Sequence, residues 1–263
     1  MTDRTGLVPD MPEAEYHGGP ELSSTGAKRI VTCPAQYRWE TDHRVNKAAY
    51  DFGHVAHELV LGRGQGYVAI DGNRNTKAVK EQIAEAEAQG LVVLKSVDLE
   101  RAQTCAAAVK ERAGHLFTTG APEVSAFALD PQTWTPIRAR FDWLTEADGR
   151  PLIVDLKTTS GSTHPWQLGK TIADFGYHQQ AAWYIDTLAL LGQPDADFRF
   201  VFVETAPPHE VRIVSLPERA IDRGRELNAQ ALDLFAQCRA RNEWPCLHPT
   251  EVEIDLAAYA YAS

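Results

Sequence analysis

Two runs of alternating residues separated by Asp148-Gly149 constrain the fold of this chain more than any other feature. An Asp-Gly pair between two such runs is the strongest short-range signal for a β-hairpin with a two-residue type I′ turn. The runs cover residues 136–144 and 151–157. We therefore expect two antiparallel strands that are joined at this turn.

Successive side chains of a strand point to opposite faces of the sheet. In the second strand this alternation places Ile153, Asp155 and Lys157 on one face. In the first strand it predicts a polar face with Arg138, Arg140 and Asp142, opposite an apolar face with Ile137, Ala139, Phe141 and Trp143.

A two-residue turn at Asp148-Gly149 also predicts the register, because paired residues then have numbers that sum to 297. Asp142 would face Asp155, and Arg140 would face Lys157. Directly opposed residues have Cβ atoms about 4.5–5.5 Å apart, and two carboxylates at that distance repel each other. A divalent cation between them would remove the repulsion, and Mg²⁺ prefers such oxygen ligands.

The residues around the two aspartates predict a reaction as well as a metal. The main-chain carbonyl of Leu156 is a candidate further ligand, and Lys157 would lie beside the ion. A lysine there could position or deprotonate an attacking water, or stabilise charge on a phosphate. Together these groups favour metal-assisted phosphodiester hydrolysis. The alternative is an ordinary hairpin with one solvated, charged face, and a longer loop would change the register.

The remaining pattern predicts one α/β domain over residues 21–263, with a helical N-terminal portion and a flexible lead-in over residues 1–20. Apolar spacing favours further strands at 123–129, 198–204 and 211–216. The expected helices cover residues 23–31, 45–61, 76–88, 97–113, 175–191 and 217–241.

Composition limits the classes of function. The net charge of −10 argues against a general electrostatic nucleic-acid binder, so a DNA enzyme would need a local basic track. No apolar run reaches the length of a membrane helix, and residues 1–20 lack the pattern of a secretion signal. We therefore expect a cytoplasmic protein that does not bind membranes. The four cysteines form no C-x-x-C pair and are expected to be free thiols.

Five segments resemble the PD-(D/E)xK nuclease superfamily. Asp142, followed after twelve residues by Asp155-Leu-Lys157, fits its D…(D/E)-x-K signature. Four segments resemble the RecB-like and RecE-like branch in particular, and they occur in that branch's order. They are Leu22-Ser-Ser-Thr with Cys33-Pro-Ala-Gln-Tyr, Gly53-His-Val-Ala-His57, Asp155-Leu-Lys-Thr-Thr159 and Tyr177-His-Gln-Gln-Ala-Ala-Trp-Tyr184.

The resemblance implies a restriction-endonuclease-like core, a central mixed β-sheet flanked by helices. It implies that Asp142 and Asp155 bind metal, that Lys157 is the catalytic lysine, and that His57 lies at the metal. It also implies that Tyr177, Gln180 and Tyr184 help to bind DNA near the cleaved phosphate. Each of these residues has an alternative role. Tyr177 and Tyr184 could be core aromatics and Gln180 a surface residue, and His57 could be a zinc ligand. Arg140 and Glu123 are candidate accessory residues, although Glu123 is also typical of an ordinary strand end.

Some nucleases of this branch hold an iron–sulfur cluster with one N-terminal cysteine and three clustered C-terminal cysteines. This chain has Cys33, but its C-terminal part offers only Cys238 and Cys246. Four thiolates are the usual requirement. We therefore expect no cluster, and we expect Cys33 and Cys246 to be packing residues.

The resemblance is greatest to RecE-like exonucleases, and it implies a Mg²⁺-dependent deoxyribonuclease in which Mn²⁺ could substitute. Such an enzyme would resect linear duplex DNA ends 5′→3′ and supply single strands to a RecT-type annealing protein. A homo-oligomer, a bacterial cytoplasm and a phage origin would fit this assignment. The alternatives are a RecB-like single-strand exonuclease, a structure-specific endonuclease, or a DNA- or partner-binding module without catalysis.

Overall fold

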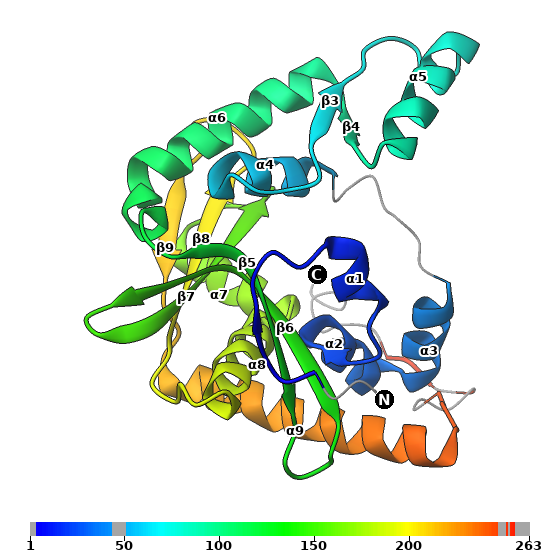
Figure 1. Cartoon of the computed structure of the whole chain (residues 1–263), viewed down its shortest axis with the longest axis vertical. Coiled ribbons are helices and arrows are strands. Elements are labelled where there is room, and N and C mark those ends of the chain that lie inside the picture. The colour runs from blue at the N-terminus through cyan, green and yellow to red at the C-terminus, as the bar shows by residue number, and fades with distance from the viewer. Residues whose placement is uncertain (1–3, 44–50, 247–250, 252, 256–263) are drawn as a thin grey trace.

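The protein is described here by a computed structural model, which covers residues 4–43, 51–246, 251 and 253–255 (Figure 1). Within these residues the centre is a mixed sheet in the order β1-β5-β6-β7-β8-β9, with β2 paired to β6. The β2–β6 and β7–β8 pairs are parallel, and the other neighbours are antiparallel. The strands are β1 (Gly6–Val8), β2 (Leu22–Ser23), β5 (Ala121–Leu129), β6 (Pro136–Ala147), β7 (Arg150–Thr159), β8 (Asp197–Glu204) and β9 (Val211–Val214).

Helices cover both faces of this sheet (Figure 1). One core lies between the sheet and α2, α7, α8 and α9, and a second core lies between the opposite face and α4 and α6. A small parallel pair, β3 (Tyr67–Ala69) and β4 (Val92–Leu94), lies beside α5 at the outer end of α4. The helices are α1 (Glu13–Gly18), α2 (Ser24–Thr32), α3 (Pro34–Asp42), α4 (Asp51–Leu61), α5 (Lys77–Ala88), α6 (Ser96–Ala113), α7 (Pro165–Asp174), α8 (Tyr177–Leu190) and α9 (Glu218–Arg241), with a short 3₁₀ helix at Gly114–Phe117.

The predicted hairpin is confirmed. Asp148 and Gly149 have φ angles of 51° and 73°, the left-handed values that a type I′ turn requires at both positions. Pairing runs from Ala147↔Arg150 to Trp143↔Val154 in the expected register. The predicted fold class, a mixed sheet flanked by helices, is confirmed as well.

The pairing predicted beyond Trp143↔Val154 is wrong. The β6–β7 ladder ends there, so neither Asp142 with Asp155 nor Arg140 with Lys157 forms a ladder pair. β7 continues past this point along β8, its neighbour on the other side. Asp142 and Asp155 therefore lie where two strands diverge, rather than across an intact ladder.

A local irregularity in the β5–β6 pairing, at Glu123 and Asp142, lies next to this divergence. Pro122 pairs with Trp143 and Val124 with Phe141, but the two acidic residues between them form no pair. Glu123 has a φ of 52°, which reverses the alternation of side chains along the strand. Phe141 packs in the core beside α8, whereas Trp143 packs in the core beside α6, so the alternation of side chains along β6 is also interrupted between them. The prediction that Phe141 and Trp143 share a face is therefore wrong.

The N-terminal residues also differ from expectation. The sequence predicts a flexible lead-in over residues 1–20, but within the described residues 4–20 β1 pairs with β5 and α1 follows. Met11 and Tyr16 are buried against Phe127, and this apolar contact holds the segment on the sheet. The extent of the predicted domain, residues 21–263, stays a prediction.

Most predicted elements are present within one or two residues of the expected bounds. The expected helix at 45–61 appears as α4, and its first residues lie outside the described range. Pro34 does end α2, but it also begins α3, because proline is well suited to the first turn of a helix. The sequence analysis did not assign α3, α7, β3 or β4. No helix among the described residues has the length and apolar character needed to cross a bilayer.

Candidate active site

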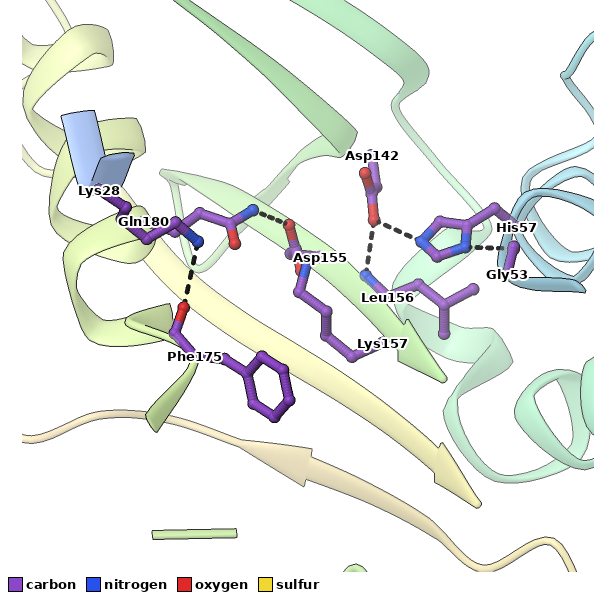
Figure 2. A network of polar contacts seen from close by, with 9 residues as sticks. All are labelled: Lys28, Gly53, His57, Asp142, Asp155, Leu156, Lys157, Phe175 and Gln180. Atoms are coloured by element: carbon purple, nitrogen blue, oxygen red, sulfur yellow. Dashed lines mark hydrogen bonds and ion pairs between the residues drawn. The ribbon is translucent and has the colours of Figure 1, made fainter. Parts of the chain in front are cut away.

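The candidate site lies where β6 and β7 part (Figure 2). The Oδ2 atom of Asp142 accepts a hydrogen bond from the backbone N–H of Leu156 at 2.8 Å. The side chain of Asp142 thus bonds a backbone group of β7 beyond the end of the ladder. This contact fixes the carboxylate of β6 against β7, close to Asp155.

His57 approaches Asp142 from α4. Its Nε2 lies 3.1 Å from Asp142 Oδ2, and its Nδ1 lies 2.7 Å from the carbonyl oxygen of Gly53. Both neighbours are acceptors, so both ring nitrogens are placed to donate, as in the charged imidazolium. Burial disfavours that charge, but Asp142 outweighs it and raises the pKa of His57 to about 9. In turn, although burial opposes it, His57 lowers the pKa of Asp142.

Asp155 lies on β7 and is 1% exposed. Its Oδ1 accepts a hydrogen bond from Gln180 Nε2 of α8 at 2.8 Å, and its Oδ2 lies 2.5 Å from Lys157 Nζ. Burial raises the pKa of Asp155 to about 6; Lys157 acts against this rise and Asp142 adds to it. The carboxylate therefore holds its negative charge less readily than a solvated one.

Lys157 is paired with Asp155 rather than with the predicted neighbour Arg140. Burial disfavours its charge, but the two aspartates outweigh burial and raise the pKa of Lys157. Its Nζ also lies 5.1 Å from the ring centroid of Tyr177, within range of a cation–π interaction. Lys157 is thus a charged ammonium group next to both carboxylates.

Glu123 is a third carboxylate at this point. It lies opposite Asp142 across the β5–β6 irregularity. Burial and then the charge of Asp142 raise the pKa of Glu123 to about 7, against the influence of Arg140. Arg140 Nη1 lies 3.8 Å from Glu123, and other nitrogens of Arg140 donate to Ser125 Oγ and to the Met11 carbonyl. Arg140 is therefore tied to β5 and the N-terminal segment, away from Lys157.

The three expected residues of α8 lie at different depths. Gln180 contacts Asp155, and Tyr177 contacts Lys157. Tyr184 is 8% exposed and packs edge-on against Phe141, with ring centroids 5.3 Å apart. Tyr184 nonetheless borders a cavity of about 430 Å³ that reaches Asp142 and is also lined by the start of α2.

Two residues beside the site, Lys28 and Phe175, were not predicted from the sequence. Lys28 of α2 donates from Nζ to the carbonyl oxygen of Phe175 at 3.2 Å (Figure 2). The same Nζ lies 5.7 Å from the centroid of the Tyr177 ring. Burial, and then the charge of Lys157, lowers the pKa of Lys28 to about 8. Only the fold brings α2 to this position, so no spacing in the sequence marks Lys28 or Phe175 as site residues.

The donor chemistry fits a divalent metal ion. Asp142, Asp155 and Glu123 supply carboxylate oxygens, and the Leu156 carbonyl is next to them in sequence; Mg²⁺ and Mn²⁺ prefer such ligands. Burial raises the pKa of both Glu123 and Asp155, and the charge of Asp142 adds to each rise, so a cation beside these groups would favour their charged forms. Within the described residues His57 and Lys157 supply the balancing positive charge, and no three acidic, histidine or cysteine side chains form a preassembled metal site.

The four cysteines do not gather at one place. Cys105 and Cys238 are buried in α6 and α9, and Cys105 Sγ lies 3.3 Å from His209 Nδ1. The sulfur atoms of Cys33 and Cys246 are 4.0 Å apart and unbonded. All four cysteines are therefore free thiols in the structure. The expected absence of an iron–sulfur cluster stays a prediction.

A hairpin that diverges at an aspartate, with an Asp-x-Lys on the second strand and helices on both sheet faces, defines the PD-(D/E)xK class of nuclease folds. The chain belongs to the family of PDDEXK-like domains of unknown function, DUF3799, whose model matches residues 23–250. The predicted superfamily is therefore confirmed.

Solved structures agree with the fold. A protein from Eubacterium rectale described as a "Putative exonuclease" is 15% identical, with a TM-score of 0.62 and coverage of 94% of this chain and 93% of that one. A phage related exonuclease from Haemophilus somnus 129PT is also 15% identical and covers 84% of this chain and 96% of its own, but its TM-score of 0.37 is too low to argue from. No curated protein sequence matches this chain.

Proposed function

We propose that this protein is a metal-dependent DNA exonuclease that hydrolyses phosphodiester bonds at the point where β6 and β7 part. The observation that carries the proposal is the meeting of two carboxylates, the partly buried Asp142 and the buried Asp155, with the ammonium group of Lys157. Bound Mg²⁺ or Mn²⁺ would polarise the phosphate and lower the pKa of an attacking water.

The chain's own residues supply the remaining functions. Asp142 and Asp155 would hold the ion together with the Leu156 carbonyl and Glu123. Gln180 fixes the Asp155 carboxylate by its hydrogen bond. With Asp155 serving as a metal ligand, Lys157 would be placed to stabilise negative charge on the phosphate. His57 could join the metal ligands only after its Nε2 loses a proton, so it is first a group that orients Asp142.

The finer assignment is 5′→3′ resection of linear duplex ends, as in RecE-like enzymes. The similarity in fold to the Eubacterium rectale protein supports an exonuclease, and the motif order in residues 22–184 supports this branch. A RecT-type annealing protein as partner, a homo-oligomeric state and a bacterial cytoplasm belong to the same proposal.

The test is digestion of linear duplex DNA labelled at either its 5′ or its 3′ ends, with Mg²⁺, with Mn²⁺ or with EDTA. We expect metal-dependent loss of 5′ label first. Asp155→Asn and Lys157→Ala should each abolish it, whereas the exposed controls Asp233→Asn and Lys80→Ala should not.

Other outcomes select the alternatives. Digestion of single strands only would favour a RecB-like exonuclease, and cleavage of branched or nicked DNA alone would favour a structure-specific endonuclease. If wild-type protein binds DNA but leaves every substrate intact with either metal, the chain is a binding module and the proposal is wrong.

A further inference from the structure

Phe175 is a large apolar side chain that is 62% exposed at the corner between α7 and α8. Its ring is stacked on Tyr177, with centroids 5.6 Å apart and planes 16° from parallel. Gly176 forms the corner with a φ of 61°, and the Phe175 carbonyl accepts the hydrogen bond from Lys28. The ring is thus held from one side and open to solvent on the other.

This ring lies close to the chemistry. Tyr177 is in contact with Lys157, which is paired with Asp155, so one aromatic ring lies between Phe175 and the reacting groups. Phe175 covers one face of the Tyr177 ring, but this packing role does not require the other face of Phe175 to be exposed to solvent. Exposed aromatic rings beside a charged groove are the usual platforms on which nucleic-acid bases stack.

Lys28 adds a charge at the same corner. Its Nζ approaches the Phe175 carbonyl and the Tyr177 ring, yet among the described residues it forms no ion pair with a carboxylate. Lysine donors without a carboxylate partner suit phosphate oxygens. An ammonium and an open aromatic ring side by side match the two parts of a nucleotide.

We propose that Phe175 and Lys28 form a subsite for an unpaired nucleotide next to the cleaved phosphate, with the base stacked on Phe175 and its phosphate bound by Lys28. The proposal rests on the proposed function, which it deepens by naming the form of the substrate. A base inside a duplex has both faces covered by its neighbours. The end that enters this site must therefore be single-stranded or frayed at that nucleotide.

The experiment measures binding without hydrolysis, in Ca²⁺, by fluorescence anisotropy of a labelled 12-nucleotide single strand. One abasic nucleotide is placed at each position in turn. For wild-type protein we expect a loss of about tenfold in affinity at one position, as removal of one stacked base predicts. Phe175→Ala should bind the intact strand about tenfold more weakly and become insensitive to the abasic nucleotide at that position.

Matched variants separate stacking from general damage. Phe175→Trp should retain the wild-type pattern, and Trp134→Ala, which removes a 71% exposed ring far along the sheet, should leave it unchanged. Lys28→Gln should weaken binding and reduce the slope of log affinity against log salt by roughly 0.7, the contribution of one contact to a single strand. Lys28→Arg should restore that slope, and Lys80→Gln should not change it.

The proposal is overturned if Phe175→Ala keeps the wild-type response to abasic nucleotides, if blunt duplex is bound as tightly as frayed duplex, or if wild-type protein binds no DNA. A different result would contradict the proposed function alone: Phe175→Ala loses the response to the abasic nucleotide, but wild-type protein cleaves no DNA with Mg²⁺ or Mn²⁺. Cleavage with no Phe175 response leaves the proposed function standing and removes the subsite.

Discussion

Three acidic side chains lie around one imidazolium, with Asp155 buried and Asp142 and Glu123 partly buried, and they make this site sensitive to pH. The pKa of Glu123, raised to about 7, and that of Asp155, raised to about 6, mean that the folded state binds these protons more tightly than the unfolded chain. Protonation therefore stabilises the metal-free fold, and this stability is lost as pH rises from about 4 to 7. The raised pKa of His57 adds stability that is present below about 6.5 and is lost as pH rises through 9.

Glu123→Gln isolates the acidic part of this effect. In EDTA, we expect the variant to gain stability relative to wild type as pH rises from 4.5 to 7, and the difference to level off above 7. Melting temperatures measured at half-unit steps of pH test it. The exposed Glu85→Gln is the control and should run parallel to wild type. A difference that shrinks as pH rises would contradict the assigned direction of the pKa shift.

Individual contacts at the site were predictable only where they are local. Tyr177 and Gln180 are three residues apart, so their place on one helix follows from helical spacing. Arg140 was expected beside Lys157, but its partners Ser125, Glu123 and Met11 come from β5 and the N-terminal segment. Nothing in the hairpin itself encodes those long-range contacts.

At the scale of elements, the distance between α8 and α9 determines where Gln180 and its neighbours lie. Gly224 of α9 meets α8 so closely that an added Cβ would lie 2.4 Å from the His178 carbonyl oxygen and 2.9 Å from Ala182 Cβ. Both are rigid atoms, so a side chain here would push α8 away from α9. That displacement would move α8, whose Gln180 donates the hydrogen bond that fixes the Asp155 carboxylate.

Gly224→Ala should therefore destabilise the protein by roughly 1–3 kcal/mol, the usual effect of overpacking, despite the better helix propensity of alanine. Gly169→Ala in α7 is the matched control, because an added Cβ there meets nothing within 4 Å. It should be neutral or stabilising by up to about 1 kcal/mol. Urea unfolding of both variants checks the signs, and a stabilising Gly224→Ala would show that the two helices can separate freely.

The hairpin shows how far element prediction reaches. Asp148-Gly149 specified the turn and the register of five residue pairs, because a two-residue turn fixes both locally. The turn does not encode where the ladder ends, because β6 and β7 also pair with β5 and β8, and β8 comes from a distant part of the sequence. The left-handed φ of Glu123 was unpredictable for the same reason, since a glutamate ordinarily avoids that conformation.

At the scale of the whole molecule, the site joins the two helical layers. His57 reaches it from α4, which packs on one face of the sheet, and Gln180 reaches it from α8, which packs on the other. Within the described residues the acidic groups at the centre form ion pairs with His57, Arg140 and Lys157. An ion bound there would link β6 to β7 at the point where their backbone ladder stops.

Metal binding should therefore stabilise the folded protein as a whole. An ion that binds only the folded state adds about 2.7 kcal/mol at one hundred times its dissociation constant. For a chain of this size each kcal/mol raises the melting temperature by roughly 2–4 °C, so Mn²⁺ should raise it by roughly 5–10 °C relative to EDTA. Asp142→Asn should lose most of this shift, because it removes a ligand and the anchor of His57, whereas Asp233→Asn should keep it. Equal shifts in wild type and Asp142→Asn would mean that the ions bind elsewhere on this acidic protein, and would remove the physical basis for placing the reaction between β6 and β7.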